Sequence, residues 1–132
     1  MPAKPLPRPT EAELELLRVL WERGPLTVRE IHDALSDDKA TGYTTTLKIL
    51  QKMTGKGLVR RNESQRSHVY EPVMKAEQTQ RQLVRDLLHK AFGGSPGQLV
   101  MQALSEKKAT ATELSEIRRL LDDLEAKQES RR

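Results

Sequence analysis

Apolar residues recur at helical spacing near the start of the chain. A capping box, Thr10-Glu11-Ala12-Glu13, precedes them, and its Thr and Glu side chains can satisfy free backbone amides at a helix start. Gly24-Pro25 follows them and should end the helix, because both residues interrupt helices. The spacing of three and four positions predicts an amphipathic helix whose core-facing residues are Leu14, Leu17, Leu20 and Trp21.

Two further helices are predicted in the next thirty residues. The capping box Thr27-Val28-Arg29-Glu30 starts a short one, and the polar run at residues 36–42 ends it. The other should run from about Tyr43 to Thr54, where the glycines at positions 55 and 57 end it. The expected core-facing residues of the two helices are Ile31, Ala34 and Leu35, then Tyr43, Thr46, Ile49, Leu50 and Met53.

The pattern changes from helical to β-prone after Gly57. Residues 58–61 and 68–71 are short β-prone runs on either side of a polar, charged segment, which predicts a β-hairpin. Pro72 should limit the second strand, because proline cannot donate a hydrogen bond to a neighbouring strand. Three helices followed by a hairpin is the element order of a winged helix-turn-helix. The predicted fold class is therefore mainly α with a small β-hairpin wing, and the winged helix should span residues 10–74.

Residues 75–127 return to a helical pattern and should form three helices. Ser95-Pro96 is a suitable start for the middle helix, and a capping box at residues 110–113 starts the last one. Their apolar stripes are too small for a core of their own, so we expect this part to be a dimerisation domain that packs against a second copy. We expect residues 1–9 to be a disordered arm and residues 128–132 a frayed tail. The expected dimerisation residues are Leu83, Leu87, Leu88, Phe92, Leu99, Val100, Leu104, Leu114, Ile117, Leu120, Leu121 and Leu124.

Basic residues are concentrated in the third helix and the hairpin. The whole chain carries 23 Lys and Arg against 19 Asp and Glu, a net charge of +4. Between Lys39 and His68, seven basic residues stand against one acidic residue, Glu63, which gives this interval a net charge of +6. The third helix and the hairpin are the elements that a winged helix presents to DNA, so the charge favours nucleic-acid binding over the alternative of a merely solvated face.

The exposed side of the third helix carries residue types that suit recognition of double-stranded operator DNA. Threonine hydroxyl and methyl groups near a helix start can contact base edges, whereas Lys52 and Lys56 lie later and suit phosphate contacts. The alternative for Thr44 is that it only caps the helix. The predicted DNA-binding residues are Thr44, Thr45, Leu47, Lys48, Gln51, Lys52, Lys56, Arg29 and Arg66.

Composition and spacing argue against several other classes of protein. The absence of cysteine excludes disulfides, zinc fingers and thiol catalysis. His32, His68 and His89 stand far apart without metal-binding spacing, so we expect no enzyme activity, metal or cofactor, and we place His32 on a helix surface. No apolar run reaches about 18 residues, so we expect no membrane insertion and a cytoplasmic location. The alternative function is a winged-helix module for protein contact, which predicts an exposed apolar patch on the third helix, where only Leu47 is available.

Five segments of the chain follow a family pattern: TEAELELLRVLWERGPLTVREIHDAL (10–35), YTTTLKILQKMTGKGLVRR (43–61), HVYEPV (68–73), FGGSPGQLV (92–100) and ELSEIRRLL (113–121). Through them nearly the whole chain, from Thr10 to Leu124, resembles the BlaI/MecI penicillinase repressors, to which the copper-responsive CopY repressors are related. The resemblance implies a winged helix that reads the major groove of a palindromic operator, and a helical dimerisation domain. It also implies that the positions of Thr44, Thr45, Leu47 and Lys48 lie at the DNA.

Three departures from the family pattern bear on recognition and on relief of repression. Leu47 stands where a polar or basic residue can occur, and it can contact a thymine methyl instead. The resemblance implies a membrane sensor-protease as a partner, but the matching place for the Asn-Phe cleavage pair holds Asp86-Leu87. Copper-responsive members carry cysteines near the C-terminus, and this chain has none, so copper sensing through thiolates is excluded.

Overall fold

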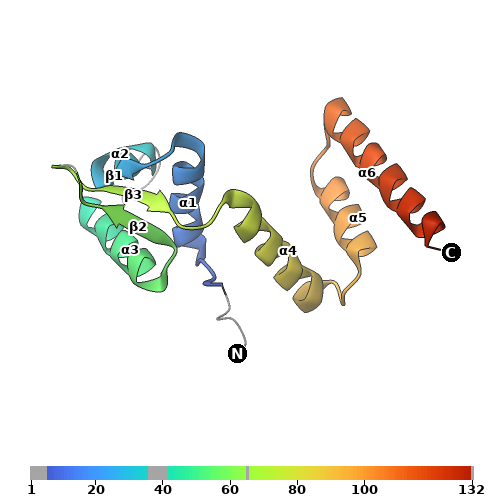
Figure 1. The fold of residues 1–132 in the computed structure, drawn as a ribbon, viewed down its shortest axis with the longest axis horizontal. Helices are drawn as coiled ribbons and strands as arrows, with labels where there is room; N and C mark the ends of the chain where they lie inside the picture. Colours follow the sequence, from blue (N-terminus) through green and yellow to red (C-terminus); the bar gives the residue numbers. More distant parts are fainter. Residues whose placement is uncertain (1–5, 36–41, 65, 132) are drawn as a thin grey trace. The chain divides into compact units, whose positions relative to one another are not determined.

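The computed structural model describes residues 6–35, 42–64 and 66–131. The chain divides into two compact units, one ending at Leu83 and the other beginning at Val84. In chain order, the elements are α1 (Glu11–Arg23), β1 (Leu26–Thr27), α2 (Val28–Leu35), α3 (Tyr43–Lys56), β2 (Val59–Asn62), β3 (Val69–Pro72), α4 (Ala76–Ala91), α5 (Pro96–Glu106) and α6 (Ala111–Ser130) (Figure 1).

Side-chain caps begin four of the helices, as the sequence predicts. In the capping box of α1, the Glu13 N–H donates to Thr10 Oγ1 over 3.2 Å, and the Thr10 N–H donates to Glu13 Oε1 over 2.8 Å. The same reciprocal bonds occur between residues 27 and 30 at α2 and between residues 110 and 113 at α6. Ser95 Oγ accepts from the Gln98 N–H at the start of α5. The predicted starts of these helices are confirmed.

A three-stranded antiparallel sheet lies beside the first three helices. Its strand order is β1-β3-β2, so β3 is the central strand. The predicted hairpin is confirmed as β2 and β3. Pro72 is the last residue of β3. Only Val69 and Tyr70 of β3 pair with β1, so the missing N–H of Pro72 removes no hydrogen bond to β1. The sequence pattern does not predict β1, because two residues are too few to show alternation.

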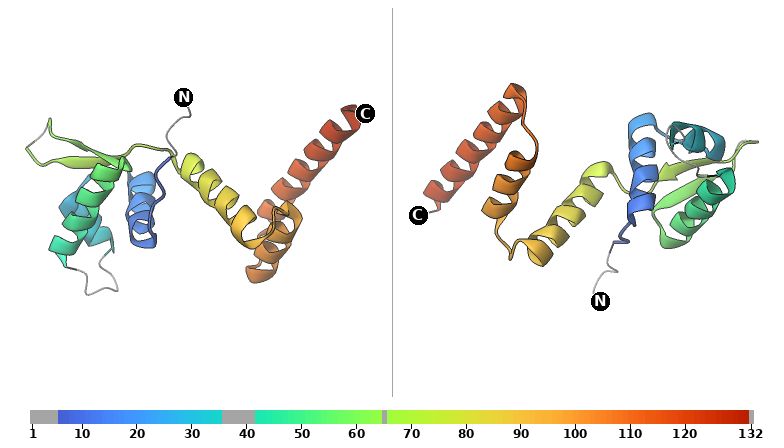
Figure 2. Two further views of the ribbon diagram at one scale, coloured as in Figure 1. Left: turned by 90° about the horizontal axis from the view of Figure 1, so that it is seen from below. Right: turned by 180° about the vertical axis from the view of Figure 1, so that it is seen from behind.

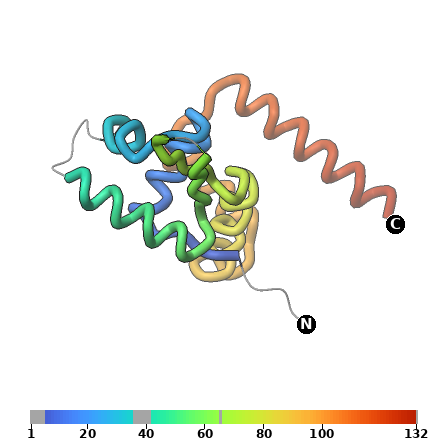
Figure 3. Tube along the Cα trace, turned by 60° about the vertical axis from the view of Figure 1, so that its left-hand side comes forward, coloured from blue at the N-terminus to red at the C-terminus, as the bar shows by residue number. Residues whose placement is uncertain are grey.

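The core of the N-terminal unit lies between α1, α2, α3 and the sheet. α1 buries Leu16 together with the predicted Leu17 and Leu20, whereas the predicted Leu14 is only half-buried. Figures 2 and 3 show the three helices gathered on this core, and in Figure 2 the loop end of the β2–β3 hairpin projects beyond them. The packing fixes α3 and the hairpin against one scaffold. The core residues are Leu16, Leu17, Leu20, Ile31, Leu50, Met53, Leu58, Val59, Tyr70 and Met74.

Both ends of α3 differ from the prediction. Tyr43 is expected in the core, but it is 39% exposed, because its ring rests against side chains of α2 at the surface. The helix also continues through Gly55 to Lys56, and Gly57 ends it. Gly57 has a φ of 83°, a left-handed conformation that favours glycine, and its N–H bonds to carbonyls of the last turn.

The N-terminal arm, predicted to be disordered, is fastened where the structure describes it. The Leu6 carbonyl accepts a hydrogen bond from Gln82 Nε2 over 2.9 Å, and the Arg8 carbonyl accepts one from Lys56 Nζ over 3.2 Å. Residues 1–5 of the predicted arm lie outside the described residues. The N-terminal compact unit extends to Leu83, so it includes the first turns of α4.

Between Val84 and Arg131, no described residue is buried. The aliphatic side chains of α6 remain open, and Leu120 is 57% exposed. α6 also continues to Ser130, through most of the predicted frayed tail, because the Lys, Gln and Glu residues there are good helix formers. As the sequence predicts, these helices lack a core of their own.

Candidate nucleic-acid interface

One side of α3 is polar, basic and open, whereas the opposite side is buried. Thr46, Leu50 and Met53 face the core and anchor the helix. The periodicity of the helix then directs the intervening side chains outward. The predicted DNA-binding residues that are exposed on this side are Thr44, Thr45, Lys48, Gln51 and Lys52.

The structure resolves the two interpretations of Thr44. The N-cap of α3 is Gly42, which has no side chain and makes no side-chain cap. The Thr45 and Thr46 amides bond instead to the Gly42 carbonyl, over 3.1 and 3.2 Å. Thr44 therefore lies inside the first turn without capping it, and its exposed hydroxyl remains available to a ligand.

Arg29, Tyr43 and His32 fasten α2 to the start of α3. The Arg29 guanidinium lies 4.8 Å from the centre of the Tyr43 ring, a cation–π contact. His32 meets the same ring edge-on at 5.9 Å, and its Nδ1 is 3.1 Å from Thr46 Oγ1. His32 is therefore half-buried between the two helices rather than on the helix surface that the sequence suggests. The contacts fix the direction in which the first turn of α3 points.

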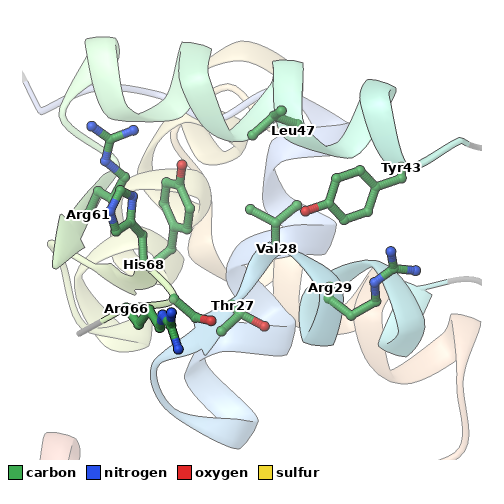
Figure 4. A pocket seen from close by; sticks show the side chains of 10 residues that line it. Thr27, Val28, Arg29, Tyr43, Leu47, Arg61, Arg66 and His68 are labelled. Carbon is green, nitrogen blue, oxygen red and sulfur yellow. The ribbon is translucent and has the colours of Figure 1, made fainter. Parts of the chain in front are cut away.

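A surface cavity of about 330 Å³ lies between the start of α2, α3 and the hairpin (Figure 4). Three predicted DNA-binding residues, Arg29, Leu47 and Arg66, line it. Leu47 is half-buried, and Figure 4 shows it on α3 near Val28. The residues that line the cavity are Thr27, Val28, Arg29, Tyr43, Leu47, Arg61, Arg66, Ser67, His68 and Tyr70.

The two arginines of β2 have different surroundings. Arg60 Nε lies 3.3 Å from Glu71 Oε1, and both side chains line a second cavity beside Trp21. Arg61 lines the cavity next to α3 and pairs with Glu63 at the loop end of the hairpin. Hydrogen bonds, first to Glu63 and then to Tyr70, raise the pKa of Arg61 above its ordinary value, so its positive charge is secure. Arg60 and Arg61 line different cavities because the side chains of neighbouring strand residues point to opposite faces of the sheet.

Lys56, predicted to contact phosphate, has a structural partner instead. Its Nζ lies 2.6 Å from Glu13 Oε1, and the Glu13 side chain is only 5% exposed. Burial acts to raise the pKa of Glu13, but hydrogen bonds from Lys56 and Thr10 outweigh it and hold the pKa below its ordinary value. The ion pair joins the start of α1 to the end of α3. Lys56 therefore has a structural role, and its contact with DNA phosphate stays a prediction.

The predicted dimerisation residues lie on α4, α5 and α6, except Phe92, which lies between α4 and α5, and none of them is buried within the chain. A side chain that is buried within its own chain cannot contact a second copy. None of the twelve is buried, so all of them remain available for such contact. Six are half-buried: Leu83, Leu88, Phe92, Leu99, Leu104 and Ile117. Six are exposed: Leu87, Val100, Leu114, Leu120, Leu121 and Leu124.

Sequence reasoning missed several residues of the cavity. Thr27 and Val28 come from β1 and α2, Tyr43 from α3, and Arg61 and His68 from the hairpin. Only the cluster of basic residues signals them in the sequence. Lys39, which contributes to that cluster, lies outside the described residues.

Within the described ranges no helix is long and apolar enough to cross a membrane, and no group of His, Asp and Glu side chains could hold a metal ion.

Three helices, a hairpin wing and an open basic helix face define a winged-helix protein of the DNA-binding class. A family described as the penicillinase repressor matches residues 9–123. The chain therefore belongs to the penicillinase repressor family, and the family resemblance drawn from the sequence is confirmed.

Individual relatives agree with this assignment. The chain is 34% identical over 122 residues to the transcriptional regulator BlaI of Mycobacterium tuberculosis, covering 92% of this chain and 88% of the relative. It is 22% identical over 120 residues to the penicillinase repressor of Bacillus licheniformis, and the match covers 91% of this chain and 94% of the relative. Among solved structures, it resembles the monomeric form of Bacillus licheniformis BlaI in complex with the blaP half-operator. That match has a TM-score of 0.50 and 25% identity, and covers 57% of this chain and 92% of the other.

Proposed function

We propose that the protein is a cytoplasmic, homodimeric repressor that binds a palindromic operator in double-stranded DNA. The observation that carries the proposal is the open side of α3, with two threonines at its start and Lys48 and Lys52 beyond them. A helix anchored by a buried opposite side can enter the major groove without losing its packing. The operator complex of a repressor with this fold supports the same partner.

The dimer is proposed from the open apolar side chains of α4–α6. Two copies that cover these side chains would be related by twofold symmetry, and a twofold dimer reads two inverted half-sites. The α3 helices of the two copies would then occupy major grooves about one helical turn of DNA apart.

The structure gives less support to the alternative of a protein-contact module. Such a module needs an exposed apolar patch on α3. Among the described residues of α3, Leu47 is half-buried in the cavity wall, and the exposed Tyr43 ring is partly covered by Arg29. A regulator without enzyme activity therefore remains the proposal.

A membrane sensor-protease remains a proposed partner on the strength of the family resemblance. The place that matches the cleavage site, Asp86-Leu87, lies within α4. Proteases bind extended segments, so this part of α4 would have to unwind before cleavage.

Selection from a pool of random duplexes tests the proposed function. The full-length protein should enrich an inverted repeat whose half-sites are centred about 10 base pairs apart. Enrichment of no sequence, or of a single unrepeated half-site by a confirmed dimer, would contradict it.

Thr45→Ala should change the base preference at one position of each half-site. The hydroxyl and methyl groups of Thr45 are exposed at the start of α3, where they can reach base edges. The same selection, repeated with the variant, measures the change, and we expect a loss of discrimination of about 1 kcal/mol at that base pair. An unchanged motif would remove Thr45 from the base-reading residues.

Lys52→Ala should weaken binding to all duplexes by a similar factor. Lys52 is exposed beyond the threonines on the open side of α3, where phosphate contact needs no particular base. The slope of log K against log salt concentration should fall by about 0.9, the change expected for one lost phosphate contact. Fluorescence anisotropy over a salt series measures it. A loss confined to one operator sequence, with the slope intact, would argue against the phosphate role.

A further inference from the structure

The cavity between α3 and the hairpin has the chemistry of an anion site. Three arginines line it: Arg29 on α2, Arg61 on β2 and Arg66 on the loop between the strands. The imidazole of His68 is a fourth nitrogen donor (Figure 4). Hydroxyl groups come from Thr27, Tyr43, Ser67 and Tyr70, and among the described residues that line the cavity none is acidic.

We propose that this cavity binds one phosphate group. Arginine is the side chain that suits phosphate best, because its planar fork can donate two parallel hydrogen bonds to two oxygens. The apolar side chains of Val28 and Leu47 form part of the wall, which limits the water that competes for those donors. A volume of about 330 Å³ leaves room for a phosphodiester together with part of its sugar.

Arg29 is held in place for this role. Its guanidinium lies 4.8 Å from the centre of the Tyr43 ring, which covers one face of the group. Stacking on a face leaves the edge, which carries the N–H donors, free to bind oxygen. The arginine therefore loses less conformational freedom when an anion arrives, which favours binding.

Arg61 carries a built-in competitor for the anion. Its guanidinium pairs with Glu63, and the two side chains are 44% and 53% exposed. An ion pair this open contributes little stability, so a phosphate can replace the carboxylate at small cost. We infer that Glu63 occupies Arg61 until the ligand arrives, and that it lowers the affinity of the site.

The source of the phosphate follows from the position of the cavity, and this step rests on the proposed function. If α3 lies in the major groove and the hairpin lies against the adjacent minor groove, one DNA strand must pass between them. The cavity is between these two elements. Its ligand is then a backbone phosphate of that strand. A free phosphate ester would use the same donors.

Two matched pairs of variants isolate the site. Arg61→Gln removes a lining cation, and Arg60→Gln makes the same charge change one residue away, where the side chain lines the other cavity. Glu63→Gln removes the competitor, and Glu71→Gln removes the corresponding partner of Arg60. Thermal unfolding establishes that each variant is folded before binding is measured.

The first probe is inorganic phosphate, followed by NMR of the arginine Nε–H and His68 ring signals. We expect Arg61→Gln to weaken phosphate binding about tenfold, the effect of one charge-assisted hydrogen bond, and Glu63→Gln to strengthen it several-fold. Arg60→Gln and Glu71→Gln should leave it unchanged. Equal effects within each pair, or no phosphate binding by the wild-type protein together with no coupling in the DNA experiment below, would overturn the proposal.

The second probe is the duplex recovered by selection, with one neutral methylphosphonate placed at each backbone position in turn. At one position per half-site, the wild-type protein should lose about tenfold in affinity while Arg61→Gln loses nothing further. That coupling identifies DNA as the source of the phosphate. Binding of inorganic phosphate without such coupling supports the same site with a free phosphate ester as ligand. Failure of the selection, with phosphate binding intact, would count against the proposed function and not against the cavity.

Discussion

Leu120→Asp should convert the proposed dimer into a monomer and weaken operator binding by about a hundredfold or more. In the single chain Leu120 is 57% exposed, so aspartate there meets water and leaves the helix folded. In the proposed dimer the same side chain is covered by a second copy, where an unpaired carboxylate costs several kcal/mol. Twofold symmetry places the substitution in the interface twice, which increases the penalty. Each 1.4 kcal/mol changes the dimer dissociation constant tenfold.

Sedimentation equilibrium over a range of concentrations measures the change in assembly. Ser115→Asp is the matched control, because it introduces the same charge on the same helix but about half a turn away from the apolar stripe. It should leave the dimer intact. If Leu120→Asp also remained dimeric, with circular dichroism equal to the wild-type protein, the interface would have to lie elsewhere on α4–α6.

The parts of the fold that the sequence predicts well depend on local signals. Each capping box joins residues three positions apart, so Thr10 and Glu13 define the start of α1 whatever the rest of the chain does. β1 depends instead on pairing with β3, more than forty residues later, and its two residues carry no pattern of their own. The predicted core position of Tyr43 is wrong for a similar reason. The spacing of Tyr43 fits the core side of α3, but its ring packs at the surface against Arg29.

In the candidate site, too, the sequence predicts the residues that follow a local pattern and misses those that come together through tertiary packing. The open side of α3 follows from helical periodicity, so Thr45, Lys48 and Lys52 are found where the sequence places them. The cavity could not be predicted, because Val28, Leu47 and His68 come together only through tertiary packing. A count of charges treats every lysine alike, so the sequence does not show that Lys56 is the partner of buried Glu13.

Lys56→Met should destabilise the N-terminal unit by about 2 kcal/mol at pH 7. Removing the partner of a fully buried carboxylate costs about 3–5 kcal/mol, and this pair should cost less because Lys56 is 38% exposed. Methionine keeps most of the apolar stem, so the loss reports on the charge. Urea unfolding followed by circular dichroism measures it. Lys52→Met is the control: this lysine is exposed, so its replacement should change stability by less than about 0.5 kcal/mol.

The pH dependence separates the ion pair from other causes of the loss. In the wild-type protein the pKa of Glu13 is held below its ordinary value of 4.5, so its stabilising effect is complete above that pH and disappears as the pH falls through the folded-state value. Without Lys56, burial should dominate and raise the pKa of Glu13, so the carboxyl group takes up a proton in the folded variant first. The difference in unfolding free energy between the two proteins should therefore be largest at neutral pH, and it should begin to shrink above pH 4.5, where Glu13 of the folded variant takes up its proton. A variant that kept wild-type stability and instead lost salt-dependent DNA affinity would return Lys56 to the phosphate-binding residues.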